Sequence, residues 1–228
     1  MRHFCASAVA AACLGMFAMQ AQASTVKLTN YTYTPAKSVH VGIDLPGSSL
    51  DLSYTGGAGE FKGTLDGKSF KTYCLDLYES FSFNTTYTDY HLASLDPVKS
   101  FAIGRLVTKY RPLVDTAQEA AAFQVALWEL EYETSGTYDL THGSFKETSS
   151  DSGVRTLAQS WLSNLGTVSM FNVQVLESLG HYDSRHHWIA GHQDFLVTSP
   201  VPEPSTWALM AGGLLGVGFV ARRRAPRR

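Results

Sequence analysis

The chain has 228 residues, of which 44% are hydrophobic and 17% charged, and its formal net charge is −2. The two ends hold six of the 18 basic residues but one of the 20 acidic residues, so residues 24–200 carry 12 basic against 19 acidic side chains, a net of −7. So acidic a segment argues against nucleic-acid binding, which requires clustered Lys and Arg. Its length suits one domain with a substantial core.

The first 23 residues have the layout of a secretory signal peptide. Arg2 precedes an apolar run over residues 4–19, and Ala21 and Ala23 supply small residues at the two positions that a signal peptidase reads. We expect export by the secretion machinery and cleavage after Ala23. Lipidation at Cys13 is the weaker alternative, because the residues before it lack the leucine that is usual in a lipoprotein box.

The first third of the exported body predicts β-structure, because short segments rich in Val, Thr and Tyr alternate with turn residues. Asp66 and Gly67 form an Asp-Gly pair, which is a strong hairpin signal between two of these segments. The expected strands cover residues 25–34, 38–44, 49–54, 60–64 and 69–77.

Three helices are expected in the middle of the chain. Asp96 can cap the first, with Pro97 at the first helical position. Asp115 and Gln118 could form a capping box at the start of the second. Gly166 is placed to end the third. The second and third helices are expected over residues 116–133 and 152–164.

Alternating segments at 171–175 and 193–198 then predict a return to strands. Strands, then helices, then strands indicate an α+β fold. We therefore expect N-terminal antiparallel β-structure, central helices and C-terminal strands, flanked by the signal peptide and a short C-terminal transmembrane segment.

The last 28 residues have a layout of their own. A Val-Pro-Glu-Pro motif is followed by 15 uncharged residues, 207–221, and then by five arginines within 222–228. A helix of that length barely crosses a hydrocarbon layer of ~30 Å, and the arginines favour a cytoplasmic C-terminus. The motif residues are Val201, Pro202, Glu203 and Pro204.

This order of motif, short apolar span and arginine cluster resembles the PEP-CTERM sorting signal of Gram-negative bacteria. The resemblance implies transient anchoring in the inner membrane, cleavage by an exosortase near the Pro-Glu-Pro, and final placement at the cell surface or in the extracellular matrix. The chain then divides into signal peptide 1–23, exported body 24–200 and sorting signal 201–228, the last comprising the motif (201–206), the helix (207–221) and the basic tail (222–228).

Cys74 is the single cysteine left after the signal peptide is removed. A lone cysteine in an oxidising compartment has no internal disulfide partner, so it is buried and inert, paired with another chain, or bonded to another group. Alternation along its segment predicts that Cys74 and Asp76 share one face of a strand.

Gln124 falls on the apolar arc of the second helix, between Leu127 and Trp128, whereas Glu129 and Glu133 are expected to face water. A buried amide without partners costs about 1–3 kcal/mol. From the pattern alone, Gln124 is a core residue bonded to backbone, and Cys74 is a small buried hydrophobe.

Together, the Tyr-Cys-Leu-Asp segment around Cys74 and the Phe-Gln-x-x-Leu-Trp segment around Gln124 are similar to motifs of the thioester domains of bacterial surface adhesins. The resemblance implies that the Cys74 thiol and the Gln124 carboxamide condense with loss of ammonia, and that the bond then captures an amine or hydroxyl once, without turnover. The residues expected around the bond are Tyr73, Asp76, Phe123 and Trp128.

Two other groups are weaker candidates. Four histidines could bind a metal but lack a defined ligand spacing, which favours a polar loop. Three glutamates of the second helix could supply paired carboxylates for glycoside hydrolysis, but the first and third diverge, which favours an exposed acidic face. These residues are His181, His186, His187 and His192, and Glu129, Glu131 and Glu133.

We therefore predict an exported surface or matrix protein, not an enzyme, that needs no cofactor or metal and adheres through an internal thioester. Its expected partners are an exosortase, the secretion machinery, the inner membrane for a time, and an extracellular polysaccharide or surface ligand, with no nucleic acid. The alternative is a structural protein of a biofilm or exopolysaccharide in which the same residues form no bond.

Overall fold

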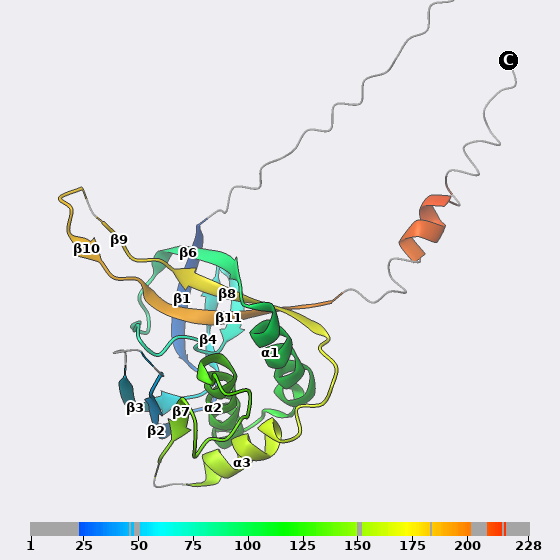
Figure 1. Cartoon of the computed structure of the whole chain (residues 1–228). Helices are drawn as coiled ribbons and strands as arrows, with labels where there is room; N and C mark the ends of the chain where they lie inside the picture. The colour runs from blue at the N-terminus through cyan, green and yellow to red at the C-terminus, as the bar shows by residue number, and fades with distance from the viewer. Residues whose placement is uncertain are drawn as a thin grey trace, which may run out of the picture.

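The computed structural model describes residues 23–45, 47, 51–149, 152–182, 184–201, 209–215 and 217. Within these residues the fold is α+β with mostly antiparallel strands, as the sequence predicts. A large sheet forms the upper layer, and helices with a second, smaller sheet lie below it (Figure 1).

The large sheet has six strands in the order β11-β8-β6-β1-β4-β5. Its outer strands approach each other just beyond β5, where Cys74 pairs antiparallel with Phe195 of β11, and the Leu196 N–H donates to the Tyr73 carbonyl at 3.0 Å. These contacts close the sheet into a barrel. The strands are β1 (Ser24–Tyr31), β4 (Phe61–Leu65), β5 (Lys68–Thr72), β6 (Tyr87–Ser94), β8 (Phe171–Ser178) and β11 (His192–Pro200).

The β4–β5 hairpin turns at Asp66 and Gly67, as predicted. Both residues have positive φ, 50° and 75°, which is the requirement of the tight turn that Asp-Gly favours. Asp66 also accepts the Thr25 N–H at 2.7 Å, so the turn is attached to the start of β1. The prediction for the next strand is only partly right, because β5 ends at Thr72 and the chain continues irregularly through Cys74.

Helix α2 lies in the middle of the lower layer. It packs against α1 and α3 and against the small sheet, whose order is β3-β2-β7 (Figure 1). A short β9–β10 hairpin projects sideways from the barrel, on the left in Figure 1. The remaining elements are α1 (Pro97–Tyr110), η1 (Arg111–Leu113), α2 (Ala117–Tyr132), α3 (Ser152–Leu162), β2 (Lys37–Ile43), β3 (Leu52–Ala58), β7 (Phe145–Glu147), β9 (His181–Tyr182) and β10 (Trp188–Ile189).

The capping residues predicted for α1 are confirmed, whereas those predicted for α2 are wrong. Asp96 accepts the backbone N–H groups of the first turn of α1 and Pro97 occupies its first position, as predicted. At α2 the capping box is formed by Thr116 and Glu119, not by Asp115 and Gln118. A capping box needs a side-chain acceptor three residues before a carboxylate or amide. Thr116 and Glu119, one residue later than predicted, form both of its reciprocal hydrogen bonds.

The prediction that Glu129 and Glu133 face water is wrong. Glu129 is 0% exposed and Glu133 8% exposed. Helical periodicity predicts one wet face only when a helix packs on one side. Because α1, α3 and the small sheet surround α2, its residues from Ala120 to Leu130 are buried on every face.

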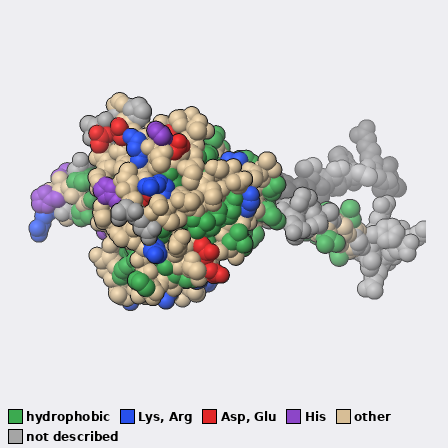
Figure 2. Space-filling model, turned by 90° about the horizontal axis from the view of Figure 1, so that it is seen from below, with side chains coloured by type: hydrophobic (Ala, Val, Ile, Leu, Met, Phe, Trp, Pro, Cys, Tyr) green, Lys and Arg blue, Asp and Glu red, His purple; other side chains and the backbone are tan. Residues whose placement is uncertain are grey.

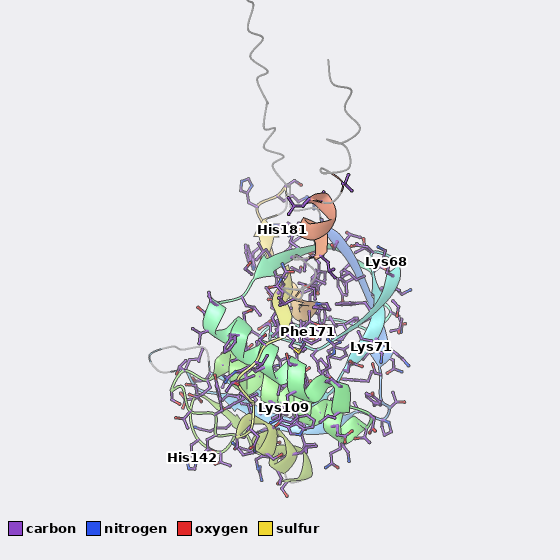
Figure 3. All side chains as sticks on the ribbon, turned by 90° about the vertical axis from the view of Figure 1, so that its right-hand side faces the viewer. Lys68, Lys71, Lys109, His142, Phe171 and His181 are labelled. Carbon is purple, nitrogen blue, oxygen red and sulfur yellow. The ribbon has the colours of Figure 1, made fainter. Side chains whose placement is uncertain are left out.

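The strand predictions were incomplete. β6 and β7 were not predicted, and β3 begins three residues later than expected and extends to Ala58. The sequence of β6 does not predict a barrel strand, because only Tyr90 among its eight residues is buried and no clear apolar alternation results. Figure 3 looks onto one end of the barrel, where Lys68 and Lys71 lie on β5 to one side of Phe171, the first residue of β8, and Lys109 lies below on α1.

Several predictions fall at the ends of the chain. Ala21 of the signal-peptidase site and Pro202, Glu203 and Pro204 of the sorting motif lie outside the described residues. Of the expected transmembrane segment, residues 209–215 and 217 are helical and exposed. Among the described residues, no helix has both the length and the apolarity needed to cross a membrane.

Candidate functional site

Cys74 lies on the line where the barrel closes. The residue is 1% exposed, and Tyr73 and Leu75 on either side are equally buried. The alternation expected along this strand is therefore absent. One side of the segment faces the barrel strand β11 and the other faces α2, whose Phe123 ring packs 4.5 Å from that of Tyr73. Barrel closure thus brings Cys74 against the central helix.

The Gln124 carboxamide is attached to the backbone of Cys74 at both of its polar atoms. The Cys74 N–H donates to Gln124 Oε1 at 2.9 Å, and Gln124 Nε2 donates to the Cys74 carbonyl at 2.7 Å. Gln124 is 1% exposed, so these two bonds satisfy an amide that would otherwise be costly to bury. The predicted burial of Gln124 is confirmed, and the amide carbon is held beside the residue that carries the thiol.

Three groups surround the sulfur. The thiol donates to the Asp76 carbonyl at 2.7 Å, and the Gln193 side-chain amide donates to Sγ from β11. Burial raises the pKa of the Cys74 thiol well above its usual value, and the indole N–H of Trp128 acts in the opposite direction. The resting group is therefore a neutral thiol, shielded from water.

The Asp76 side chain holds the turn that follows Cys74. Its carboxylate accepts the backbone N–H groups of Tyr78 and Glu79 at 2.9 and 2.7 Å and the Tyr132 hydroxyl at 3.2 Å. The Tyr132 oxygen also accepts the Leu77 N–H at 2.8 Å. These bonds fix the turn that carries the Asp76 carbonyl to which the thiol donates, and the charge of Asp76 also acts to raise the pKa of Cys74.

A cavity of about 370 Å³ opens beside this turn. Its wall is mainly acidic and aromatic, with Asp76, Asp194, Glu131 and Tyr132 facing one cation, Lys99. Lys99 bonds Glu131 at 2.9 Å. Burial, and then the charge of Asp76, raise the pKa of Asp194 to about 7. The cavity brings solvent to within two residues of Cys74 along the chain.

The thiol and the carboxamide that an amide-to-thioester exchange would require lie on two residues that contact each other. Addition of Sγ to the amide carbon would develop negative charge on Oε1, where the Cys74 N–H donates. The amide nitrogen would take the thiol proton and leave as ammonia. The same two hydrogen bonds also suit a stable core glutamine, so the geometry is compatible with both readings of the sequence.

The weaker candidates are placed elsewhere. His181 lies on β9 and His186 in the turn between β9 and β10, a hairpin that projects from the barrel (Figure 1), and Figure 2 shows histidines at the edge of the molecule. Among the described residues, no three His, Cys, Asp or Glu side chains form a group able to hold a metal ion. Glu129 and Glu133 are buried, so the helix has no exposed acidic face and the expectation of one is wrong.

Two residues at the site were not identified from the sequence. Gln193 reaches the sulfur from 119 positions away, and Tyr132 reaches Leu77 from 55 positions away. Tyr132 lies two turns after Gln124 on the same helix, and this spacing could have predicted that both side chains face the segment around Cys74. No local pattern marks Gln193, because its position follows from the closure of the barrel.

Comparison with known families identifies the C-terminal segment. Residues 200–224 match the model of the PEP-CTERM protein-sorting motif. The motif implies an exported protein that an exosortase processes at the membrane. No curated protein and no solved structure shows a significant match to the chain.

Proposed function

We propose that this exported, exosortase-processed protein acts at the cell surface or in the extracellular matrix through an internal thioester between Cys74 and Gln124. The bond would link the barrel to the central helix until a nucleophile on a target surface replaces the sulfur. The product is an amide or ester that joins Gln124 to the target, with Cys74 restored as a thiol. The protein would then act as a single-use adhesin.

The observation that carries the proposal is the double hydrogen bond between the Gln124 side chain and the Cys74 backbone. It fixes the reacting amide beside the only cysteine of the exported body, where an N–H group already polarises the carbonyl. Burial supports the same reading, because a thioester survives only where water is excluded. In the loop-entropy model, a link across about 50 residues stabilises the fold by about 4 kcal/mol.

The second candidate is a structural matrix protein that forms no bond. Two observations favour this structural role. Both polar atoms of the Gln124 carboxamide already have hydrogen-bond partners, and the pKa of the Cys74 thiol is raised. In that case the protein would associate with extracellular polysaccharide through its surface alone.

Intact mass decides between the two. The full chain is purified without reductant in mild detergent and weighed before and after treatment with methylamine. We expect a mass one ammonia below that of the processed sequence, and a gain of one methylamine on treatment. A mass equal to that of the sequence, with one thiol that can be alkylated after unfolding, would contradict the thioester and leave the structural role.

Gln159 supplies a matched control for this measurement. Its side chain bonds backbone in the same manner, accepting from Leu140 N–H and donating to the Tyr138 carbonyl, both at 2.9 Å, but no cysteine is near. Gln124→Ala and Cys74→Ala should each abolish the mass deficit. Gln159→Ala should keep it.

A further inference from the structure

The proposed thioester creates a requirement at the sulfur, and this inference rests on that proposed function. When an amine attacks the Gln124 carbonyl carbon, the carbon–sulfur bond breaks and the electron pair leaves on Cys74 Sγ. Burial disfavours such a charge strongly, since it raises the pKa of Cys74 well above the usual value. A buried thiolate leaves readily only if hydrogen-bond donors are already aimed at it.

One donor is the Gln193 side chain. Its Nε2 donates to Cys74 Sγ and also to the Asp76 carbonyl at 3.0 Å. The second bond settles the orientation of the amide, because the reversed amide would place its oxygen against that carbonyl. Gln193 itself is partly buried.

The other donor is the indole N–H of Trp128. Trp128 is 2% exposed, yet its Nε1 has no hydrogen-bond partner. A buried donor without a partner costs about 1–3 kcal/mol. This N–H acts to lower the pKa of the Cys74 thiol, which places the indole near the sulfur, although the two atoms do not meet hydrogen-bond geometry. A thiolate would satisfy this N–H in a way that the neutral thiol does not.

Packing does not explain the indole N–H. The Trp128 ring contacts Tyr54 edge-on, at 5.9 Å between centroids, and lies 6.5 Å from Phe145. Neither ring contact gives the indole N–H a hydrogen-bond partner.

We propose that Trp128 and Gln193 form a donor pair that binds the Cys74 thiolate as it leaves the thioester. The attacking amine loses one proton as it becomes the amide, and that proton ends on Sγ. No other reactant is needed: one thioester and one primary amine give one amide and one thiol. The donor pair would make the protected bond reactive once a nucleophile reaches it.

Methylamine kinetics test the donor pair. The full chain and the variants Trp128→Phe and Gln193→Met are treated with methylamine, and intact mass is followed with time. Each variant should start with the same ammonia deficit and react about tenfold more slowly, because each removes one hydrogen bond to a developing charge. The double variant should be slower than either. Tyr54→Phe, which keeps both donors, should react at the original rate.

The outcomes separate the two proposals. An original chain without the ammonia deficit would overturn the thioester and the donor pair with it. A deficit in all chains with equal rates would overturn the donor pair alone. A folded variant that lacks the deficit before treatment would also overturn it, because the donors would then be needed to make the bond and not to release the thiolate. Far-ultraviolet circular dichroism establishes folding, and the two single variants give independent readings.

Discussion

Gln124 and Gln159 use the same hydrogen-bonding geometry in two regions of the molecule. Each side chain donates to one backbone carbonyl and accepts one backbone N–H, at 2.7 and 2.9 Å for Gln124 and 2.9 Å twice for Gln159. Gln159, on α3, holds a partly exposed loop, whereas Gln124, on α2, is 1% exposed and holds the residue that carries the single thiol. This pair of hydrogen bonds therefore has a structural role at both sites. Whether the glutamine can also react depends on the residues around it.

The largest expected effect separates these two glutamines. Gln124→Ala leaves the N–H and carbonyl of Cys74 without partners in the core and opens a cavity, so we expect a loss of roughly 3–5 kcal/mol in the free energy of unfolding. Gln159→Ala exposes its loop to water and should cost about 1 kcal/mol. Urea unfolding followed by circular dichroism measures both. Equal losses would contradict the view that burial separates the two sites.

Glu129 sharpens the comparison, because it is as buried as Gln124 but neither carboxyl oxygen has a hydrogen-bond partner. Burial, and then the charge of Glu133, raise the pKa of Glu129 from 4.5 to about 8. The folded state therefore holds a proton that the unfolded state releases, and stability should fall as pH rises from about 4.5 to about 8, by about 5 kcal/mol in total. Glu129→Gln should remove this decline in urea unfolding measured across that range.

Glu133 provides the control with the opposite sign. It lies one turn from Glu129, and although burial acts to raise its pKa, the N–H groups of Ser135, Ser144 and Thr134 lower it overall. The charged Glu133 carboxylate should therefore stabilise the fold near neutral pH, and this stabilisation should be lost as the pH falls through the lowered pKa of Glu133. Glu133→Gln should therefore destabilise the fold at pH 7, where Glu129→Gln stabilises it. Destabilisation by both would show that Glu129 is charged and paired in the folded state.

A smaller effect is expected at Tyr132. Its hydroxyl accepts the Leu77 N–H and donates to Asp76, which ties the turn after Cys74 to α2. Tyr132→Phe leaves both groups without this partner and should cost about 1–2 kcal/mol. Hydrogen exchange at Leu77 should accelerate while exchange in α3 stays unchanged. Uniform acceleration would instead indicate a general loss of stability.

The sequence predicted much of this fold because local chemistry determines it. Asp66-Gly67 requires a tight turn, Asp96-Pro97 requires a helix start, and the placement of Gln124 among apolar residues requires a partner for its amide. Each of these constraints acts over a few residues. Local chemistry did not determine every detail, since the capping box of α2 forms at Thr116 and Glu119, one residue later than predicted.

What the sequence did not predict depends on contacts between distant segments. The burial of Glu129 follows from the elements that surround α2, and no helical pattern records how many sides of a helix will be covered. The position of Gln193 follows from the pairing of β11 with the segment after β5, which closes the barrel. Of the groups at the sulfur, Asp76 and Trp128 were expected from the sequence, and Gln193 was found only in the folded structure.

The smallest effect concerns the start of α2, where a side chain again satisfies backbone. The Thr116 hydroxyl accepts the Glu119 N–H at 3.2 Å, and Glu119 accepts the Thr116 N–H at 3.0 Å. Thr116→Ala removes the cap and should lower stability by about 1 kcal/mol, whereas Gln118→Ala, at an exposed position without a capping bond, should change it by less than about 0.5 kcal/mol. Thermal unfolding of the two variants measures the difference. If Gln118→Ala were the more damaging, the capping box would lie one residue earlier, in the register that the sequence first suggested, and the helix that carries Gln124 would begin there.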